Sequence, residues 1–310
     1  MHNFLRRGRR MNIKYLSSII MCKVNIIPDF PPRVKLIDNI ISDDALQYET
    51  KLNSTALAVF KLVDGKNNLL DIVKDMNFQY GCKDDRVLND VNQLILDANK
   101  RNILNLKIES NNLLYKNIAR LIFNILYRRV ERYDILDSNF FMIFVQLCKI
   151  IISKLKGLVI ILDLAILFIL YLSYDFNQTI YEYAWNIFAY VNLFIIGTVT
   201  SISMHETLHA YYFRKISNQT KSGFFVIRGM MMSFKRRKDQ QISGLWVELS
   251  GPFITFVIGA AGYVSTYFLI PKEFYLYFYI FFFSYLIQIV NLLPFSGDGK
   301  NILLRILFSK

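Results

Sequence analysis

Hydrophobic and polar positions follow two different patterns along the 310-residue chain. In the first third, short apolar runs alternate with polar and charged residues, which is typical of a small domain with a solvated surface. Farther along, the apolar residues form four long segments, each long enough to cross about 30 Å of hydrocarbon. These segments are about Gly157–Tyr174, Ala184–Ser203, Ser243–Ile270 and Phe274–Phe295. The pattern predicts an α-helical multi-pass membrane domain over residues 157–310, preceded by a small soluble domain.

Residues 24–110 are predicted to be that soluble domain. Short apolar runs predict strands at Val34–Ile41, Leu46–Leu52 and Ile103–Ile108. Apolar positions three or four residues apart predict helices at Ala56–Leu62, Leu69–Phe78 and Asp85–Arg101. The order of strands, three helices and a strand predicts an α+β, winged-helix-like module.

Residues 111–156 are predicted to link this domain to the membrane. Leu113–Tyr133 mixes apolar residues with five lysines and arginines, which suits a basic amphipathic helix on an anionic surface. Phe140–Ile152 is apolar but short and is followed by lysines, so it is either an interfacial helix or the first part of a bent span. For both segments, a helix packed against soluble protein is an equally good interpretation.

The composition fits a membrane protein with a soluble front part. Apolar residues make up 54% of the chain and aromatic residues 15%. Cys22, Cys82 and Cys148 are too few and too scattered for a disulfide framework. Residues 1–23 form an N-terminal extension that lacks a small-residue cleavage site, so it is not a convincing signal peptide. Translation could equally start at Met11.

The net charge of +13 indicates an anionic partner. Basic residues flank the predicted spans, where they set orientation, so membrane lipid explains the charge better than nucleic acid does. The predicted helix Asp85–Arg101 also carries Asp85, Asp90 and Asp97, which would repel DNA phosphates. We therefore expect no nucleic-acid partner and do not favour a membrane-tethered transcription regulator.

Candidate chemistry is concentrated in Met204–Ala210, which reads Met-His-Glu-Thr-Leu-His-Ala. His205 and His209 are four residues apart, so on a helix both imidazoles lie on one face, one turn apart. In the H-E-x-x-H pattern the two histidines bind zinc, and the glutamate, here Glu206, acts as a general base on water. The remaining histidine is His2, so further ligands would be carboxylates, thiolates or water. A polar helix end with two interfacial histidines is the alternative.

Loop charges predict the orientation of the spans. Tyr211–Ile242 carries eight lysines and arginines against one aspartate, whereas Asp175–Tyr183 carries no lysine or arginine. By the positive-inside rule the basic loop faces the cytoplasm, and we expect both chain termini there too, with the protein in the cell membrane. The second and fourth spans then run inward.

This orientation brings two distant chemical groups to the same depth. His205 lies about 32 Å beyond Ala184 along a helix, and Asp298 lies about 36 Å beyond Phe274. Both residues are therefore expected at the cytoplasmic edge of the membrane. A third ligand to the metal is expected at such a place, and Asp298 offers a carboxylate there.

Three stretches of the soluble domain resemble the PqqD-like peptide-recognition domain. They are Asn53–Gly65, Leu69–Val73 and the series Val87, Val91, Leu94 and Ile95. The resemblance covers about residues 28–108 and implies a domain that binds the leader of a ribosomally made precursor peptide, typically as a strand added to its sheet edge. The partners implied are this peptide and, further, peptide-modifying enzymes or an exporter. A DNA-binding winged helix and a purely structural domain are the alternatives.

Three stretches of the membrane domain resemble the site-2 protease family of membrane zinc metalloproteases. They are His205–His209, Ser250-Gly-Pro252 and Asn291-Leu-Leu-Pro-Phe-Ser-Gly-Asp-Gly299. The resemblance implies one Zn²⁺ per chain, held by His205, His209 and Asp298. It further implies that Glu206 is the catalytic base and that Asn291 helps to position substrate.

The match departs from the family pattern at two places. Family members usually have four residues between the motif proline and the aspartate, whereas three separate Pro294 from Asp298. An asparagine often follows the Gly-Pro pair, and Thr255 stands there. Both departures concern the fine geometry around Asp298 rather than the resemblance itself.

Three further features of the membrane domain carry less specific signals. Asp163, inside the first predicted span, either forms a gate or proton path or pairs with a neighbouring helix, and pairing is favoured. Glu248 is expected to reach the membrane interface. Phe224–Phe234 is expected to form a hairpin at the membrane surface, to whose edge an extended substrate could add, although simple packing is the default interpretation.

Together these features predict a membrane-embedded zinc endopeptidase that binds and cleaves a peptide during the maturation or export of a ribosomally made modified peptide. The pairing of the two modules in one chain motivates this hypothesis. The alternative is a non-proteolytic membrane protein for peptide binding, export or immunity, with a vestigial metal site.

Overall fold

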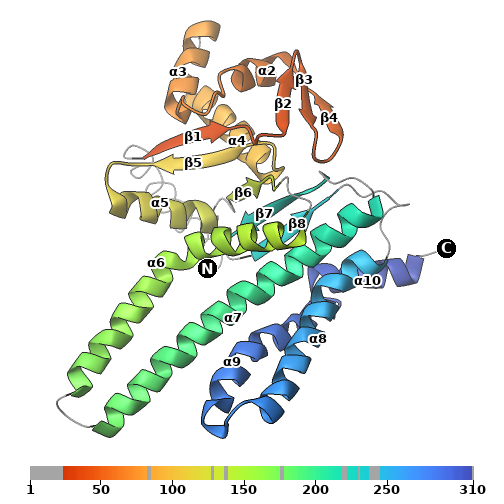
Figure 1. The fold of residues 1–310 in the computed structure, drawn as a ribbon. Helices are drawn as coiled ribbons and strands as arrows, with labels where there is room; N and C mark the ends of the chain where they lie inside the picture. Colours follow the sequence, from red (N-terminus) through yellow and green to blue (C-terminus); the bar gives the residue numbers. More distant parts are fainter. Residues whose placement is uncertain are drawn as a thin grey trace, which may run out of the picture. The chain divides into compact units, whose positions relative to one another are not determined.

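The computed structural model describes residues 24–81, 85–126, 129–135, 139–174, 178–217, 222–229, 231–236 and 245–308 (Figure 1). The predicted N-terminal extension and part of the basic loop lie outside the described residues. Contacts divide the chain into two compact units. The front unit comprises Met1–Asp134 and Ser222–Arg237, and the helical unit comprises Ile135–Lys221 and Lys238–Lys310. The chain therefore passes between the units three times.

Two small antiparallel sheets open the front unit. They are the pair β1 (Asn25–Asp29) and β5 (Asn105–Glu109), and the meander β2 (Val34–Ile37), β3 (Ile40–Asp43) and β4 (Tyr48–Lys51). The prediction of one strand over Val34–Ile41 is wrong, because a turn at Asp38, with φ of 53°, separates β2 from β3. The sequence predicts no strand at β1, which contains Pro28 and pairs with a segment far along the chain.

Three helices follow close to their predicted bounds. They are α2 (Ser54–Lys61), α3 (Leu69–Tyr80) and α4 (Asp85–Lys100). The side chains of Asn53 and Asn68 accept hydrogen bonds from first-turn N–H groups of α2 and α3, so both helices begin at a capping residue. Gly81, with φ of 62°, ends α3 in the left-handed conformation that glycine favours. Ile72 and Ile95 anchor the shared core of these helices and the β1–β5 pair.

The segment after β5 contains α5 (Leu113–Leu126) and β6 (Val130–Tyr133). The prediction of one helix over Leu113–Tyr133 is therefore correct for α5 and wrong for β6. Ala119 and Phe123 on α5 are buried in the core of the front unit, which agrees with the packed-helix interpretation. Buried and half-buried residues alternate along β6, as expected of a strand with one covered face.

A hairpin from the middle of the helical sequence completes the front unit. Its strands β7 (Phe224–Arg228) and β8 (Met231–Lys235) pair with each other, and β7 also pairs with β6. Phe224 and Phe225 are fully buried. The N–H of Gly223 donates to the carbonyl of Ala45 at 3.0 Å. The predicted hairpin therefore exists, and the apolar residues of β7 are buried inside the front unit.

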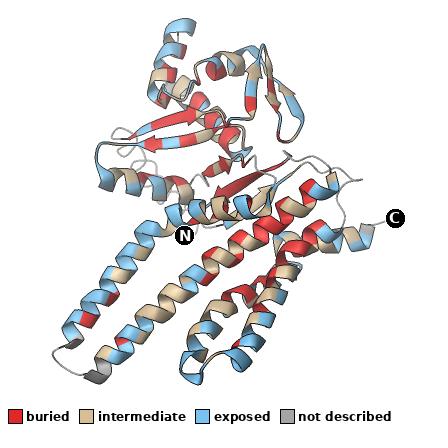
Figure 2. Ribbon diagram, in the orientation of Figure 1, coloured by how far each residue is buried: buried red, intermediate tan, exposed pale blue. Residues whose placement is uncertain are grey.

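Long apolar helices make up the helical unit. They are α6 (Phe140–Tyr174), α7 (Gln178–Ser217), α8 (Leu245–Leu269) and α9 (Tyr275–Leu286), with the short 3-10 helices η1 (Lys272–Phe274) and η2 (Ile287–Leu292) and the terminal α10 (Gly297–Phe308). Four stretches are long and apolar enough to cross a membrane, namely Phe140–Leu172, Tyr181–Ser217, Leu245–Leu269 and Lys272–Leu307. Many residues of these helices are coloured as exposed in Figure 2. Many large apolar residues are among the exposed ones, as expected of helices that face lipid. The predicted fold class is confirmed: a small α/β unit is followed by four long apolar helices.

One helical segment agrees with a predicted alternative, and another differs from the prediction. Phe140–Ile152 and the first predicted span form one continuous helix, α6, which agrees with the interpretation of this segment as the first part of a span. Lysine is a good helix former, so the lysines between the two parts do not interrupt the helix. The fourth predicted span is not a single α-helix, since α9 ends at Leu286 and the tighter η2 follows.

α7 packs against α6, α8 and α9 and is thus the central helix of its unit. Asp163 on α6 accepts a hydrogen bond from the Asn192 amide on α7 at 3.0 Å. The favoured interpretation of Asp163, pairing with a neighbouring helix, agrees with this contact. The Tyr277 hydroxyl on α9 donates to Asn186 on α7 at 2.7 Å, so polar contacts join α7 to two of its neighbours.

Candidate functional site

The motif Met204–Ala210 lies within α7, so both histidines project from one helical face as predicted. The Nε2 atoms of His205 and His209 are 3.1 Å apart, and both residues are buried. Figure 2 shows that the buried residues of α7 gather along the part of the helix that carries the motif. Glu206, between the histidines in sequence, is buried as well. The site therefore lies inside the helical unit rather than at a polar helix end.

Asp298 reaches the same place from the last helix of the chain. Its Oδ2 atom lies 3.0 Å from Nε2 of His205 and 3.3 Å from Nε2 of His209. These residues are about ninety positions apart in sequence. The structure thus brings His205 and Asp298 together, as predicted from the expectation that both lie at the same depth in the membrane.

A local turn sets the direction of Asp298. The Ser296 N–H donates to the Leu293 carbonyl at 2.9 Å, and the Ser296 hydroxyl accepts from the Gly299 N–H at 3.0 Å. Ser296 therefore caps α10, and Asp298 lies in the first turn of that helix. A Cβ atom on Gly299 would lie 2.0 Å from the Leu293 carbonyl oxygen, so this turn requires glycine.

α8 supports the imidazole of His209 from behind. Nδ1 contacts the Val247 carbonyl at 2.5 Å, and because a carbonyl can only accept, Nδ1 carries a proton. In the neutral imidazole this leaves the Nε2 lone pair able to bind a metal. Gly251 lies against the ring, where a Cβ atom would stand 2.4 Å from Nε2. Thr255, one turn farther along α8, is buried and donates to the Gly251 carbonyl at 2.7 Å.

The three ligand atoms fit a zinc ion. Tetrahedral zinc with bonds of about 2.0–2.1 Å holds neighbouring ligand atoms about 3.3–3.4 Å apart. The donor atoms of His205, His209 and Asp298 lie 3.0 to 3.3 Å from one another, and two imidazoles with one carboxylate form a ligand set that zinc accepts. Within the part of the chain that the structure describes, no other group of three such side chains gathers this closely. The two histidines differ in how their other ring nitrogen is held. Nδ1 of His209 contacts Val247, whereas Nδ1 of His205 is buried with no hydrogen-bond partner among the described residues.

Asn291 lies beside the cluster rather than in it. Its Nδ2 donates to Oε1 of Gln288 at 2.9 Å, and Nε2 of Gln288 donates to the Ser201 hydroxyl at 3.2 Å. Gln288 thus ties η2 to α7 one turn before His205. The substrate-positioning role of Asn291 stays a prediction. Gln288 is not among the predicted site residues, although a buried amide within an apolar run is a signal that could have found it.

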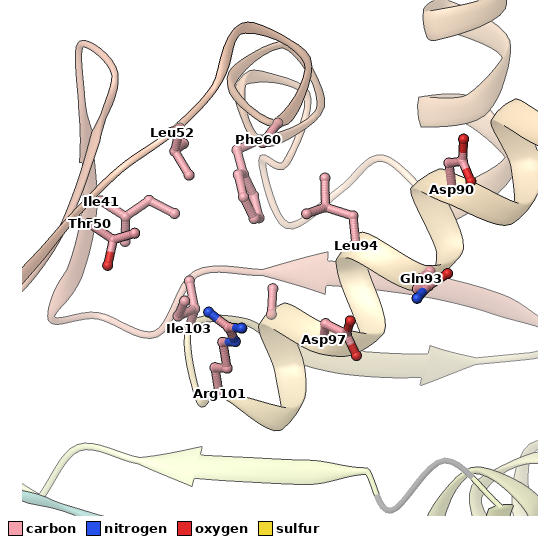
Figure 3. A pocket seen from close by; sticks show the side chains of 12 residues that line it. Ile41, Thr50, Leu52, Phe60, Asp90, Gln93, Leu94, Asp97, Arg101 and Ile103 are labelled. Atoms are coloured by element: carbon pink, nitrogen blue, oxygen red, sulfur yellow. The ribbon is translucent and has the colours of Figure 1, made fainter.

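A second feature of interest is a groove of about 390 Å³ in the front unit (Figure 3). Its apolar lining comes from Ile41, Leu52, Ala56, Phe60, Leu94, Ala98 and Ile103, and its polar lining from Thr50, Asp90, Gln93, Asp97 and Arg101. The groove runs between the β3–β4 hairpin and α4. Among the described strands β4 pairs with β3 alone, so its outer edge is open to an added strand. Such an edge beside an apolar groove can hold an extended peptide through backbone bonds and one buried side chain.

The sequence around this groove matches a known family. Residues 45–104 match the protein-family model for coenzyme PQQ synthesis protein D (PqqD). The chain contains a PqqD-like domain. The match takes in β4 and α2 to α4 and thus most of the groove lining. The comparisons with curated proteins and with solved structures give no match.

The PqqD-like domain is only a part of the front unit. The family match begins after β3 and ends before β5, whereas the predicted resemblance spans about residues 28–108. No comparison supports the resemblance of the helical unit to the site-2 proteases. Zinc binding, proteolysis and the roles of the four candidate residues in α7 and α10 therefore stay predictions.

Proposed function

We propose that this protein is a membrane-embedded zinc endopeptidase that acts on a peptide held by its PqqD-like domain. The observation that carries the proposal is the meeting of His205, His209 and Asp298, whose ligand atoms lie within 4.8 Å of one another beside Glu206. Asp298 is distant in sequence from the two histidines. If the H-E-x-x-H match were due to chance, there would be no reason for a carboxylate from another helix to lie beside it.

The side chains divide the chemistry among them. His205, His209 and Asp298 would hold the zinc ion, and the Val247 carbonyl favours the His209 tautomer that offers Nε2. A zinc ion bound there would lower the pKa of water and polarise a scissile carbonyl. Glu206 accepts the proton of the attacking water and passes it to the leaving amine. The burial of Glu206 and both histidines keeps bulk water away from this exchange.

The PqqD-like domain suggests a peptide-binding role in the biosynthesis of modified peptides. The groove and the open edge of β4 support this role, because they can hold a flexible leader without a folded partner. Cleavage requires an extended backbone, which a precursor peptide provides. Peptide-modifying enzymes or an exporter would meet the same peptide and are the expected further partners.

The four long apolar helices are consistent with a membrane protein. By the positive-inside rule, the basic residues between α7 and α8 favour a cytoplasmic location for that connection and for both termini. The metal ligands then lie near the cytoplasmic face, on the side where a ribosomally made peptide is released.

The test combines zinc content with cleavage of a co-expressed precursor peptide. We expect about one zinc per chain, lost in His205→Ala and Asp298→Ala. Glu206→Gln should keep the zinc and lose cleavage, whereas Glu182→Gln, at an exposed position on the same helix, should change neither. Leu94→Asp, in the groove, should weaken retention of the peptide at unchanged zinc content. Cleavage that persists in Glu206→Gln would overturn the mechanism.

The second candidate is a peptide-binding, export or immunity protein without proteolysis. The family match favours it, because that match covers the peptide-binding part alone. It predicts a wild type without zinc, or with zinc but without cleavage, that still retains the peptide. The same measurements therefore separate the two functions.

A further inference from the structure

The third candidate ligand stands on a short terminal helix. α10 has 12 residues, and Asp298 is the second of them. Within the helical unit, α10 contacts α8 and η2. The distance from the Asp298 carboxylate to the histidines therefore depends on how firmly α10 is held against these neighbours.

One ion pair joins α10 to α8. Nη2 of Arg305 lies 3.5 Å from Oε1 of Glu248, whose side chain is only 8% exposed. The structure thus corrects the expectation that Glu248 reaches an interface. A buried carboxylate is costly unless an opposite charge or hydrogen bonds compensate it, so this contact favours one docked position of α10.

The Glu248–Arg305 pair lies on the parts of α10 and α8 that carry or contact candidate metal ligands. Asp298 and Arg305 are seven residues apart, two helical turns, so they lie on one face of α10. On α8, Glu248 follows Val247, whose carbonyl holds His209, and precedes Gly251, which lies against the His209 ring. A single turn of α8 therefore contacts one metal ligand and anchors the helix that carries another.

We propose that Glu248 and Arg305 act as a latch that fixes α10 on α8 and so positions Asp298 for the metal. The inference rests on the proposed zinc site. Neither latch residue is among the grouped ligand side chains, so both are positioning residues that act through Asp298. Changes to residues that support a metal ligand typically lower metal affinity about 10–100-fold, and we expect about tenfold for the loss of the latch.

The experiment measures zinc dissociation constants on the purified full chain by competition with a chromophoric chelator. Arg305→Leu and Glu248→Gln should each weaken zinc binding about tenfold, and Arg305→Lys should be intermediate because it keeps the charge but not the fork of donors. Glu248→Gln removes the charge without a change of shape, so it keeps the test valid if Arg305→Leu folds poorly. Lys300→Leu, at an exposed position of α10, and Glu182→Gln are the matched controls and should leave affinity unchanged.

A double-mutant cycle tests whether the latch acts through Asp298. In the D298N background the two histidines still allow weaker zinc binding, which is measured by titration with excess zinc. Arg305→Leu should change this affinity by less than about twofold, because the carboxylate that it positions is already lost. An equal loss in both backgrounds, or unchanged affinity in Arg305→Leu and Glu248→Gln, would overturn the latch and leave the proposed zinc site standing. Absence of zinc from the wild type would overturn both, so the two failures are distinguishable.

Discussion

At the scale of single residues, the candidate site depends on one close approach between helices. Gly251 on α8 faces the His209 ring, and a Cβ atom there would stand 2.4 Å from Nε2 and 2.7 Å from Cε1. Real Cβ contacts are not this short, so any larger residue must push the imidazole or the helix away. The observed position of the His209 ring therefore requires glycine at residue 251.

We predict that Gly251→Ala weakens zinc binding by at least about tenfold, because it displaces His209 from the other two ligands. Chelator competition on the purified chain measures the effect. Gly157→Ala is the matched control, since Gly157 lies in α6 with open space around its Cα. That change should leave zinc affinity alone and stabilise the helix by about 0.5–1 kcal/mol. Unchanged affinity in Gly251→Ala would show that the ring does not occupy the position described.

The sequence predicts the site residues to different degrees for physical reasons. His205 and His209 are one helical turn apart, so their shared face follows from local geometry alone. The proximity of Asp298 to the histidines could be expected from the span lengths and loop charges, although these give only a coarse measure of depth in the membrane. The partners of Gln288 and Glu248 cannot be read from nearby residues, because Ser201 and Arg305 lie on other elements.

At the scale of elements, one buried arginine holds the third sheet of the front unit. Arg132 on β6 is fully buried and makes two hydrogen bonds to the Asp43 carboxylate, at 2.6 and 3.0 Å. It also contacts Asp134 at 3.0 Å and lies 3.8 Å above the ring of Phe224 on β7. This side chain therefore connects β3, β6 and β7.

We predict that Arg132→Leu destabilises the front unit by about 3–5 kcal/mol, because it leaves two buried carboxylates without their cation. Arg132→Lys should recover only part of the loss, since lysine cannot form the paired hydrogen bonds to Asp43. Lys35→Leu, which breaks an exposed pair with Asp44, is the control and should cost no more than about 1 kcal/mol. Hydrogen exchange of the β3 and β6 amides measures the change, and equal protection in Arg132→Leu and Lys35→Leu would contradict it.

Elements with local signals are the ones that the sequence predicts well. α2 and α3 carry capping asparagines, and α4 has a regular apolar spacing, so their bounds follow from nearby residues. β6 has no such signal. Asn99 and Asn105 bind its backbone through their side-chain amides, and β7 pairs with its other edge. A strand stabilised by distant partners looks like a continuation of the preceding amphipathic helix, which explains the wrong prediction.

At the scale of the whole molecule, the front unit and the helical unit are not separate segments of sequence. The hairpin β7–β8 lies between α7, which carries the histidines, and α8, which supports them, yet it belongs to the front unit. Ala45, Val130, Phe224 and Val226 form one buried cluster there. The stability of the front unit should therefore depend on a segment far from the PqqD-like match.

Replacement of residues 222–236 in the full chain by a glycine-serine segment of equal length tests this dependence. We expect faster hydrogen exchange at β6 and at the β3–β4 turn, because Val130 and Ala45 lose the apolar residues that cover them. Zinc content should persist, since the three candidate ligands, His205, His209 and Asp298, lie outside the replaced segment. Met231→Ser, at a position 79% exposed on β8, is the control and should leave exchange unchanged. Full protection of β6 after the replacement would mean that the residues before Ile135 fold without the hairpin, and the two parts could then be treated as independent modules.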